Sequence, residues 1–413
     1  MHKSLDEKLA EIHADPNSGA FIIADAKDAD MAFGVAAPGM SPESYAGEAR
    51  FRSLAEWRET IRQIVSQGLV DIMLMSASTN EALTIRERIF DGSPVTPAVR
   101  ANDTTDIHVA RGAVYPKQPA LPFRTATIEH IQCGRVDCSV EDRTLGANLG
   151  LYSITFNNDA AADRATIKAY KAFRVEAERK GFRHFLEVFD PNAPVNPIPP
   201  RQLGGFINDL VARTLAGVTE PGRPLFLKMV YHGPQFMEEL VRYDRHLVPG
   251  ILGGSAGTTY DAFKLLAEAK KHGARAALFG RKINNSEHQL SFIQFLRLIA
   301  EDQISPEEAV RAYHGVLGGL GIKPRRPLEL DMQLTADITS YGGSGRAVSI
   351  PGSVSAPRPT PAAAPKPARK TADRATTGGN SYPTTPAGMP DFAKMTPQQR
   401  LTYHRSRLDA MFQ

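Results

Sequence analysis

Short apolar runs alternate with amphipathic segments along roughly the first 300 residues of the chain. The runs have the composition of strands that are buried on both faces. They cover residues 21–25, 69–75, 97–100, 149–156, 184–189, 224–231, 248–255 and 274–281. Helical periodicity falls between them, over 54–66, 80–90, 160–180, 201–215, 235–243 and 258–271. Alternating strands and helices predict a parallel sheet, and eight such units are typical of a closed (β/α)8 TIM barrel.

One unit of this pattern is irregular. Between residues 102 and 148 no segment has good helical periodicity, and 125–132 has the pattern of a strand that could pair as a hairpin with 136–140. After the last strand, two further helices are predicted over 287–300 and 305–316. The second begins with Ser305-Pro-Glu-Glu, which supplies an N-cap, a proline at the first helical position and acidic residues in the first turn.

The composition changes at Gly342. Residues 353–386 are rich in proline, alanine and threonine and lack the apolar residues that a core requires, so 342–394 is predicted to be a disordered linker. A short amphipathic helix then begins at Thr396-Pro397. Its apolar stripe consists of Leu401, Leu408, Met411 and Phe412. We therefore expect a barrel over 1–341, a linker over 342–394 and a docking helix over 395–413, the alternative being that the helix folds back on the barrel.

Composition and charge narrow the classes of function. The chain is 42% hydrophobic, which is ample for a core, and its formal net charge is +4. Residues 351–413 contain nine Lys and Arg against three Asp and Glu, but this basic linker lacks interleaved aromatic residues, so we expect no nucleic-acid binding. No run is long enough to cross a membrane, and the polar start lacks a signal-peptide core, so a cytoplasmic protein is expected.

The two cysteines do not form a metal motif. Cys133 and Cys138 are separated by four residues, and no second pair of ligands accompanies them. We therefore expect free thiols on a hairpin and no metal site.

Lys228 lies within an otherwise apolar run, Pro224-Leu-Phe-Leu-Lys-Met-Val-Tyr231. An ammonium group in such a strand is costly to bury unless it is paired or neutralised. A neutral amine is a nucleophile that forms a Schiff base with a carbonyl compound. The alternative is that Lys228 pairs with a neighbouring acid such as Glu187.

The next two predicted strands end in glycine turns that precede helices. These turns are Gly253-Gly-Ser-Ala-Gly257 and Gly280-Arg281. Backbone N–H groups at such turns suit a phosphate group. In a TIM barrel the reactive groups lie at the carboxyl ends of the strands, so Lys228 and these turns are expected on the same rim.

These features resemble the class I, Schiff-base aldolases of the DeoC, FbaB and LacD kind. The resemblance covers residues from about 19 to 315 and is best over 224–283. It implies that Lys228 is the Schiff-base lysine, and that Asp25, Glu187 and Tyr152 are the candidates for acid–base catalysis. The implied phosphate-binding residues are Gly253, Gly254, Ser255, Gly280 and Arg281. Further candidates on the rim are Lys27, Arg100 and His232, for which structural ion pairs are the alternative.

The resemblance implies an aldolase that needs no metal or cofactor, acts on a phosphorylated sugar or ketose, and works as a homo-oligomer. One alternative is an acyl-transfer or condensation enzyme that uses the same lysine on a phosphorylated ketone. Another is a barrel without catalysis that acts as a scaffold or sensor through the tethered helix. The helix over 396–412 is expected to bind an assembly or shell protein, which would recruit the chain to a protein assembly or a bacterial microcompartment.

Overall fold

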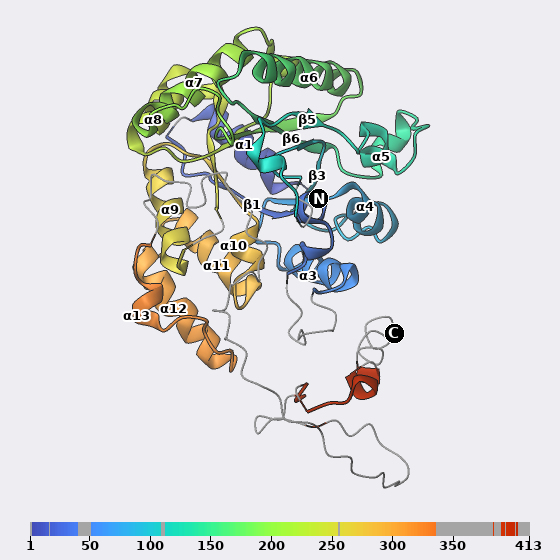
Figure 1. Cartoon of the computed structure of the whole chain (residues 1–413), viewed down its shortest axis with the longest axis vertical. Helices are drawn as coiled ribbons and strands as arrows, with labels where there is room; N and C mark the ends of the chain where they lie inside the picture. The colour runs from blue at the N-terminus through green and yellow to red at the C-terminus, as the bar shows by residue number, and fades with distance from the viewer. Residues whose placement is uncertain are drawn as a thin grey trace, which may run out of the picture. The chain divides into compact units, whose positions relative to one another are not determined.

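The chain divides into two units in the computed structural model. One comprises residues 1–39 and 53–350, and the other residues 40–52 and 351–413. The structure describes residues 2–15, 17–39, 51–108, 112–254 and 257–335, and, near the carboxyl end, 383, 390–392, 394–400 and 402–403. The first unit holds the barrel (Figure 1).

Eight parallel strands close into a barrel in the order β1-β10-β9-β8-β7-β6-β3-β2. The strands are β1 (Ile22–Lys27), β2 (Ile72–Met75), β3 (Thr96–Arg100), β6 (Leu149–Thr155), β7 (Arg183–Phe189), β8 (Leu227–Met229), β9 (Gly250–Leu252) and β10 (Ala276–Phe279). Each of the eight predicted runs overlaps one of them. The predicted (β/α)8 barrel is therefore confirmed.

Helices follow the strands and surround the barrel (Figure 1). The longer ones are α3 (Leu54–Gln67), α6 (Ala160–Arg179), α7 (Pro200–Ala216), α8 (Pro234–Tyr243), α9 (Thr259–Lys271), α11 (Gln289–Ala300) and α12 (Pro306–Gly319). Short elements join them: α2 (Ala29–Phe33), η1 (Gly34–Ala36), α4 (Ala77–Asn80), the π-helical turn η2 (Glu81–Arg86), η5 (Glu220–Gly222), η6 (Arg245–Leu247), α10 (Arg281–Asn284) and α13 (Leu328–Asp331). Reciprocal capping boxes start α3, α9 and α12, at Ser53, Thr258 and Ser305.

The predicted hairpin over 125–140 is wrong. Residues Ile128–Cys133 form a helix, α5, whose N-cap Thr127 accepts a hydrogen bond from the His130 amide. Ile128 and Ile131 bury one face of this short helix, and their β-branched side chains suggested a strand. The other elements here are β4 (Asp103–Thr104), which pairs antiparallel with β5 (Pro122–Phe123), and the turns η3 (Tyr115–Lys117) and η4 (Glu141–Thr144). Cys133 and Cys138 are free cysteines, as expected, although they do not lie on a hairpin.

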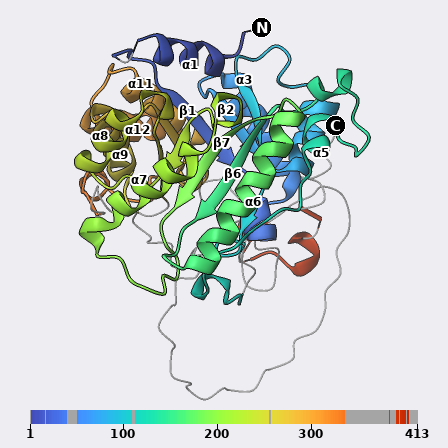
Figure 2. The same cartoon turned by 90° about the horizontal axis from the view of Figure 1, so that it is seen from above.

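A helix that the sequence reading missed, α1 (Ser4–Ala14), closes the amino-terminal end of the barrel (Figure 2). Its Leu5, Leu9 and Ile12 pack with Ile22, Ala24, Phe185, Phe226, Leu278 and other strand residues in one cluster, which we call the inner core. Two further clusters fill the space between strands and helices, and we call this space the outer layer. Because side chains alternate along a strand, membership of these clusters shows which residues point into the barrel.

In the second unit, the expected helix start at Thr396-Pro397 is present. The Gln399 amide donates to Thr396 Oγ1 at 3.3 Å, and the Thr396 amide donates to Gln399 Oε1 at 2.9 Å. The apolar positions 401, 408, 411 and 412 and most of the predicted linker lie outside the described residues. Among the helices that the structure describes, none is long and apolar enough to span a bilayer.

Candidate active site

Three polar side chains form a row across neighbouring strands inside the barrel. Ser153 of β6 is in register with Glu187 of β7, and Glu187 is in register with Lys228 of β8. Each follows an inner-core residue by two positions: Leu151 on β6, Phe185 on β7, and Phe226, which directly precedes β8. All three side chains therefore point into the barrel, near the carboxyl ends of the strands. Lys228 is 6% exposed.

Glu187 joins this row into one network. Its Oε1 lies 2.5 Å from Lys228 Nζ, and its Oε2 accepts a hydrogen bond of 2.6 Å from Ser153 Oγ. Burial alone would raise the pKa of Glu187, but the charges of Lys228 and Arg100 and the hydrogen bonds hold it below its usual value. Glu187 is therefore an ionised carboxylate that holds the lysine amine in place.

Arg100, at the end of β3, places a permanent positive charge at the centre of the network. Its Nη1 donates to Ser153 Oγ at 2.9 Å, and its Nη2 lies 3.4 Å from Glu187 Oε2. Its Nε bonds the carboxylate of Asp28, and its Nη1 lies 3.6 Å from Asp103 Oδ1. Burial opposes the charge on Arg100, but the three surrounding carboxylates outweigh burial and raise its pKa. Of the further rim candidates, Arg100 is the one that shares Glu187 with Lys228.

Asp25 and Lys27 lie on the opposite face of the sheet from Lys228. Asp25 is in register with Met73 and Phe279, whose side chains belong to the outer layer. Lys27 Nζ contacts both carboxylate oxygens of Asp25, at 2.9 and 2.7 Å, and both residues are fully buried. Trp57 of α3 covers this pair, with its ring centroid 5.6 Å from Lys27 Nζ. The pair ties β1 to the helix layer and lies apart from the network around Lys228.

Tyr152 also faces the helices. Its ring stacks on Phe173 of α6 with centroids 4.5 Å apart, and a second ring of α6, Tyr170, lies 5.2 Å away. Burial raises the pKa of Tyr152 to about 12. The structure therefore does not bring Tyr152 together with Lys228.

His232 lies between β8 and α8, beside α7. Its Nε2 is 2.9 Å from Asp190 Oδ1, and a Cβ placed on Gly204 of α7 would come within 2.8 Å of the His232 Cβ. His232 is therefore held by Asp190 at the rim, next to the helix layer.

The glycine turns of the expected phosphate site lie on neighbouring strands. The Gly253 amide donates to Leu278 O at 3.0 Å, two residues before Gly280. A Cβ on Gly253 would meet the Phe279 ring at 2.0 Å, a Cβ on Gly280 would meet Ala26 O at 2.8 Å, and Gly254 has a φ of +60°. Arg281 is the first residue of α10. Ser255 lies outside the described residues.

Lys282 connects the two glycine turns. Its Nζ donates to the carbonyl oxygens of Gly257 and Thr258 at 2.9 and 2.7 Å. Burial lowers the pKa of Lys282 to about 8. Lys282 directly follows the predicted Gly280-Arg281 turn, but no sequence pattern indicated that it would bind the preceding turn.

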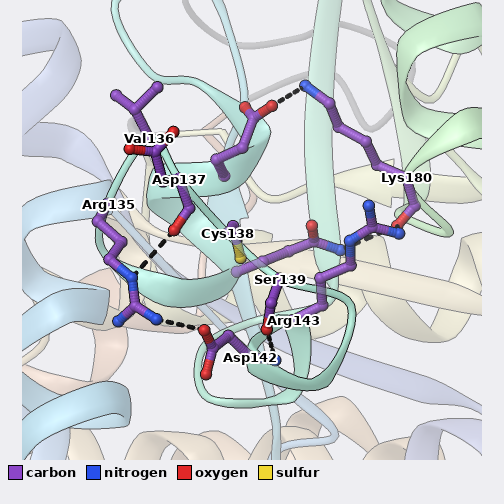
Figure 3. Close-up of a pocket in the computed structure, with 10 residues that line it drawn as sticks. Arg135, Val136, Asp137, Cys138, Ser139, Asp142, Arg143 and Lys180 are labelled. Carbon is purple, nitrogen blue, oxygen red and sulfur yellow. Dashed lines mark hydrogen bonds and ion pairs between the residues drawn. The ribbon is translucent and has the colours of Figure 1, made fainter.

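A large cavity lies away from this network. It has a volume of about 540 Å³, and Figure 3 shows it beside the loop that follows α5. Two ion pairs lie at this cavity: Arg135 pairs with Asp142 (Figure 3), and Lys180 pairs with Glu129. Lys180 follows the last residue of α6, which leads into the start of β7, so the cavity is near the opposite end of the barrel from Lys228. Within the described ranges, no group of three or more His, Cys, Asp or Glu side chains is placed to hold a metal ion.

Comparison with known proteins gives a result only at the level of structure. No family model and no curated protein matches the chain. An archaeal fructose 1,6-bisphosphate aldolase aligns with a TM-score of 0.50 at 14% identity, over 71% of this chain and 99% of that one. A fructose-bisphosphate aldolase from Slackia heliotrinireducens aligns with a TM-score of 0.51 at 14% identity, over 75% of this chain and 91% of that one.

The chain has the fold of these aldolases. The likeness inferred from the sequence is thereby confirmed for the fold.

Proposed function

We propose that the protein is a class I, Schiff-base aldolase that cleaves or forms a carbon–carbon bond in a phosphorylated sugar or ketose. One observation carries the proposal: the Lys228 amine is buried on the inner face of the barrel, at the end of its strand, 2.5 Å from the Glu187 carboxylate. The aldolase fold supports it. The site that we propose is built around Lys228, Glu187, Ser153 and Arg100, and it does not include Asp25, Tyr152 or His232.

The proposed reaction begins with loss of a proton from Lys228 Nζ. The free amine attacks the carbonyl carbon, and one proton passes from the attacking nitrogen to the carbonyl oxygen. The resulting hydroxyl takes up the proton that the lysine first lost and leaves as water, which gives an iminium ion. The ionised Glu187 next to Nζ stabilises this cation. Ser153 and Arg100 act as positioning residues, because both hold Glu187 Oε2. The iminium is the electron sink for bond cleavage, so this chemistry needs neither a metal ion nor a cofactor.

Phosphate recognition is proposed at the ends of β9 and β10, by Gly253, Gly254, Ser255, Gly280 and Arg281. Glycine allows backbone amides to approach an anion closely, and Arg281 can add a bidentate contact. Lys282 supports the proposal because it ties the end of β10 to the turn after β9.

Borohydride trapping tests the proposal. The protein is incubated with dihydroxyacetone phosphate or fructose 1,6-bisphosphate, reduced, digested and analysed by mass spectrometry, while cleavage of fructose 1,6-bisphosphate is followed in parallel. We expect a secondary-amine adduct on Lys228. Lys228→Met should lose the adduct and several orders of magnitude of turnover, and Lys228→Arg should be equally inactive because a guanidinium stays protonated.

Lys271→Met is the matched control, because Lys271 is an exposed lysine at the end of α9. It should keep both adduct and turnover. A folded Lys228→Met protein that cleaves at the original rate, or an adduct on Lys27 or Lys282, would show that the Schiff-base lysine is misassigned.

A further inference from the structure

Asp103 is a buried carboxylate next to the guanidinium group of Arg100, which also contacts Glu187. It lies on β4, three residues after Arg100, and is 2% exposed. Its Oδ1 is 3.6 Å from Arg100 Nη1, the nitrogen that also donates to Ser153. Among the described residues this Oδ1 has no hydrogen-bond partner. Asp103 therefore differs from Glu187, whose two oxygens are both engaged.

The charges around Asp103 do not balance when every group is ionised. Arg100 and Lys228 carry two positive charges, whereas Asp28, Glu187 and Asp103 carry three negative charges. A further carboxylate, Asp30 of α2, adds to the negative field at Asp103. The carboxylates of Asp28 and Glu187 are hydrogen-bonded to cations, so the excess proton belongs on Asp103.

We infer that Asp103 carries the proton that moves between the substrate hydroxyl and the substrate carbon in the proposed reaction. This inference rests on the proposed function. Burial, as the largest influence, together with the neighbouring carboxylates raises the pKa of Asp103 to about 7, against the opposing effect of Arg100. Two carboxylic acids whose environments move their pKa values apart have separate roles: Glu187 stays ionised, and Asp103 gains and loses a proton near neutral pH.

The step is balanced in atoms and electrons. Ionised Asp103 takes the proton of the hydroxyl on the β-carbon of the iminium, and the O–H electrons form the new carbonyl bond. The bond between the α- and β-carbons breaks, and its electron pair passes through the α-carbon to the iminium nitrogen and gives an enamine. After the aldehyde leaves, protonated Asp103 returns its proton to the α-carbon, the iminium forms again, and water releases the ketone.

The test separates Schiff-base formation from proton transfer in Asp103→Asn, which keeps the shape but cannot carry the proton. With dihydroxyacetone phosphate in deuterium oxide, the enzyme should incorporate solvent deuterium at the α-carbon through the enamine. We expect Asp103→Asn to keep the borohydride adduct on Lys228 within a few-fold and to lose roughly 100- to 10,000-fold in both deuterium incorporation and cleavage of fructose 1,6-bisphosphate. Asp103→Glu should restore part of both rates.

Asp106 offers a matched control. It is 4% exposed, has an unpartnered Oδ1 and has a pKa that burial raises, but it bonds Thr155 rather than Arg100. Asp106→Asn should keep deuterium incorporation near the wild-type rate. The pH profile of incorporation by the unmodified protein should show an apparent pKa near 7, a readout that does not depend on any variant folding.

The outcomes distinguish the two proposals. Absence of an adduct on Lys228 in the unmodified protein removes the aldolase proposal and, with it, the basis for Asp103. An adduct with unchanged deuterium incorporation in Asp103→Asn, or a flat pH profile through neutrality, overturns the role of Asp103 and leaves the Schiff base standing.

Discussion

Glu187 and Lys228 form a buried ion pair and should not contribute independently to the free energy of unfolding. Glu187 is 1% exposed and Lys228 is 6% exposed, so neither charge can find water when its partner is lost. Removing one member of a buried pair typically destabilises a protein by about 3–5 kcal/mol, because the remaining charge is uncompensated. We therefore expect Glu187→Gln to lower the free energy of unfolding by about that amount at pH 7.

Lys228→Met should be milder, because the contacts to Glu187 are not equally distributed. After loss of the lysine, Glu187 keeps the hydrogen bond from Ser153 at 2.6 Å and the guanidinium of Arg100 at 3.4 Å. We expect a loss of about 1–3 kcal/mol. The double variant removes both charges, so its destabilisation should be smaller than the sum of the single changes, with a coupling energy of up to about 3 kcal/mol.

Urea denaturation of the four proteins, followed by circular dichroism, measures this cycle. The pKa of Glu187 is lowered in the folded protein, so its stabilising contribution is fully present above the ordinary glutamate pKa of about 4.3 and is lost as the pH falls through the lowered value. The difference between wild type and Glu187→Gln should therefore be largest from pH 5 upward and shrink in more acidic solution. Additive single-variant effects, or a difference that does not change with pH, would refute the reasoning.

Two further predictions concern the phosphate site and the carboxyl-terminal helix. Arg281→Ala should raise KM for fructose 1,6-bisphosphate at least tenfold, because a bidentate contact to phosphate is lost, and should leave KM for an unphosphorylated ketose almost unchanged. Equal effects on both substrates in steady-state assays would show that the role of Arg281 is structural. We propose that the carboxyl-terminal helix binds an assembly protein. Deletion of residues 351–413 should leave kcat and the unfolding midpoint of the barrel equal to the wild-type values within error, and should abolish co-sedimentation with that protein. A truncated barrel that unfolds would contradict the role of the helix in docking.

The strand pattern predicted the positions of the candidate side chains along the chain, but not the face of the sheet on which each one lies. Every residue of β1 is buried, so its apolar pattern has no solvent-facing phase to show that Ile22 and Ala24 point inward. Asp25 consequently looked like a rim acid although it faces α3. Tyr152 was misplaced for the same reason, since its whole strand is buried. Which residues of these two strands face the barrel interior follows only from their register with the neighbouring strands, and that register is known from the structure.

For the network around Lys228, the sequence indicated several of the residues but not the contacts between them. Arg100, Glu187 and Lys228 are candidates from the sequence, Ser153 falls within the predicted run 149–156, and Asp103 follows the predicted run 97–100 by three residues. The shared guanidinium depends on how far each strand is shifted against the next, because Arg100 is in register with Leu151 rather than with Ser153. That shift allows one arginine to reach residues from β6 and β7, and no local pattern encodes it. Helix α1, by contrast, was readable from Leu5, Leu9 and Ile12, which recur at helical spacing.

Lys27 and Lys228 show why burial alone does not identify a reactive lysine. Each lies at a strand, each is nearly or fully buried, and each pairs with one carboxylate. Lys27 is fully buried, with the Trp57 ring 5.6 Å from its amine, so that amine has no exposed surface. Lys228 instead points into the barrel, near the carboxyl ends of the strands, which is also the end at which the glycine turns lie. The same physical cost of burying an ammonium thus stabilises the packing at one site and, at the other, provides the amine that the proposed reaction needs.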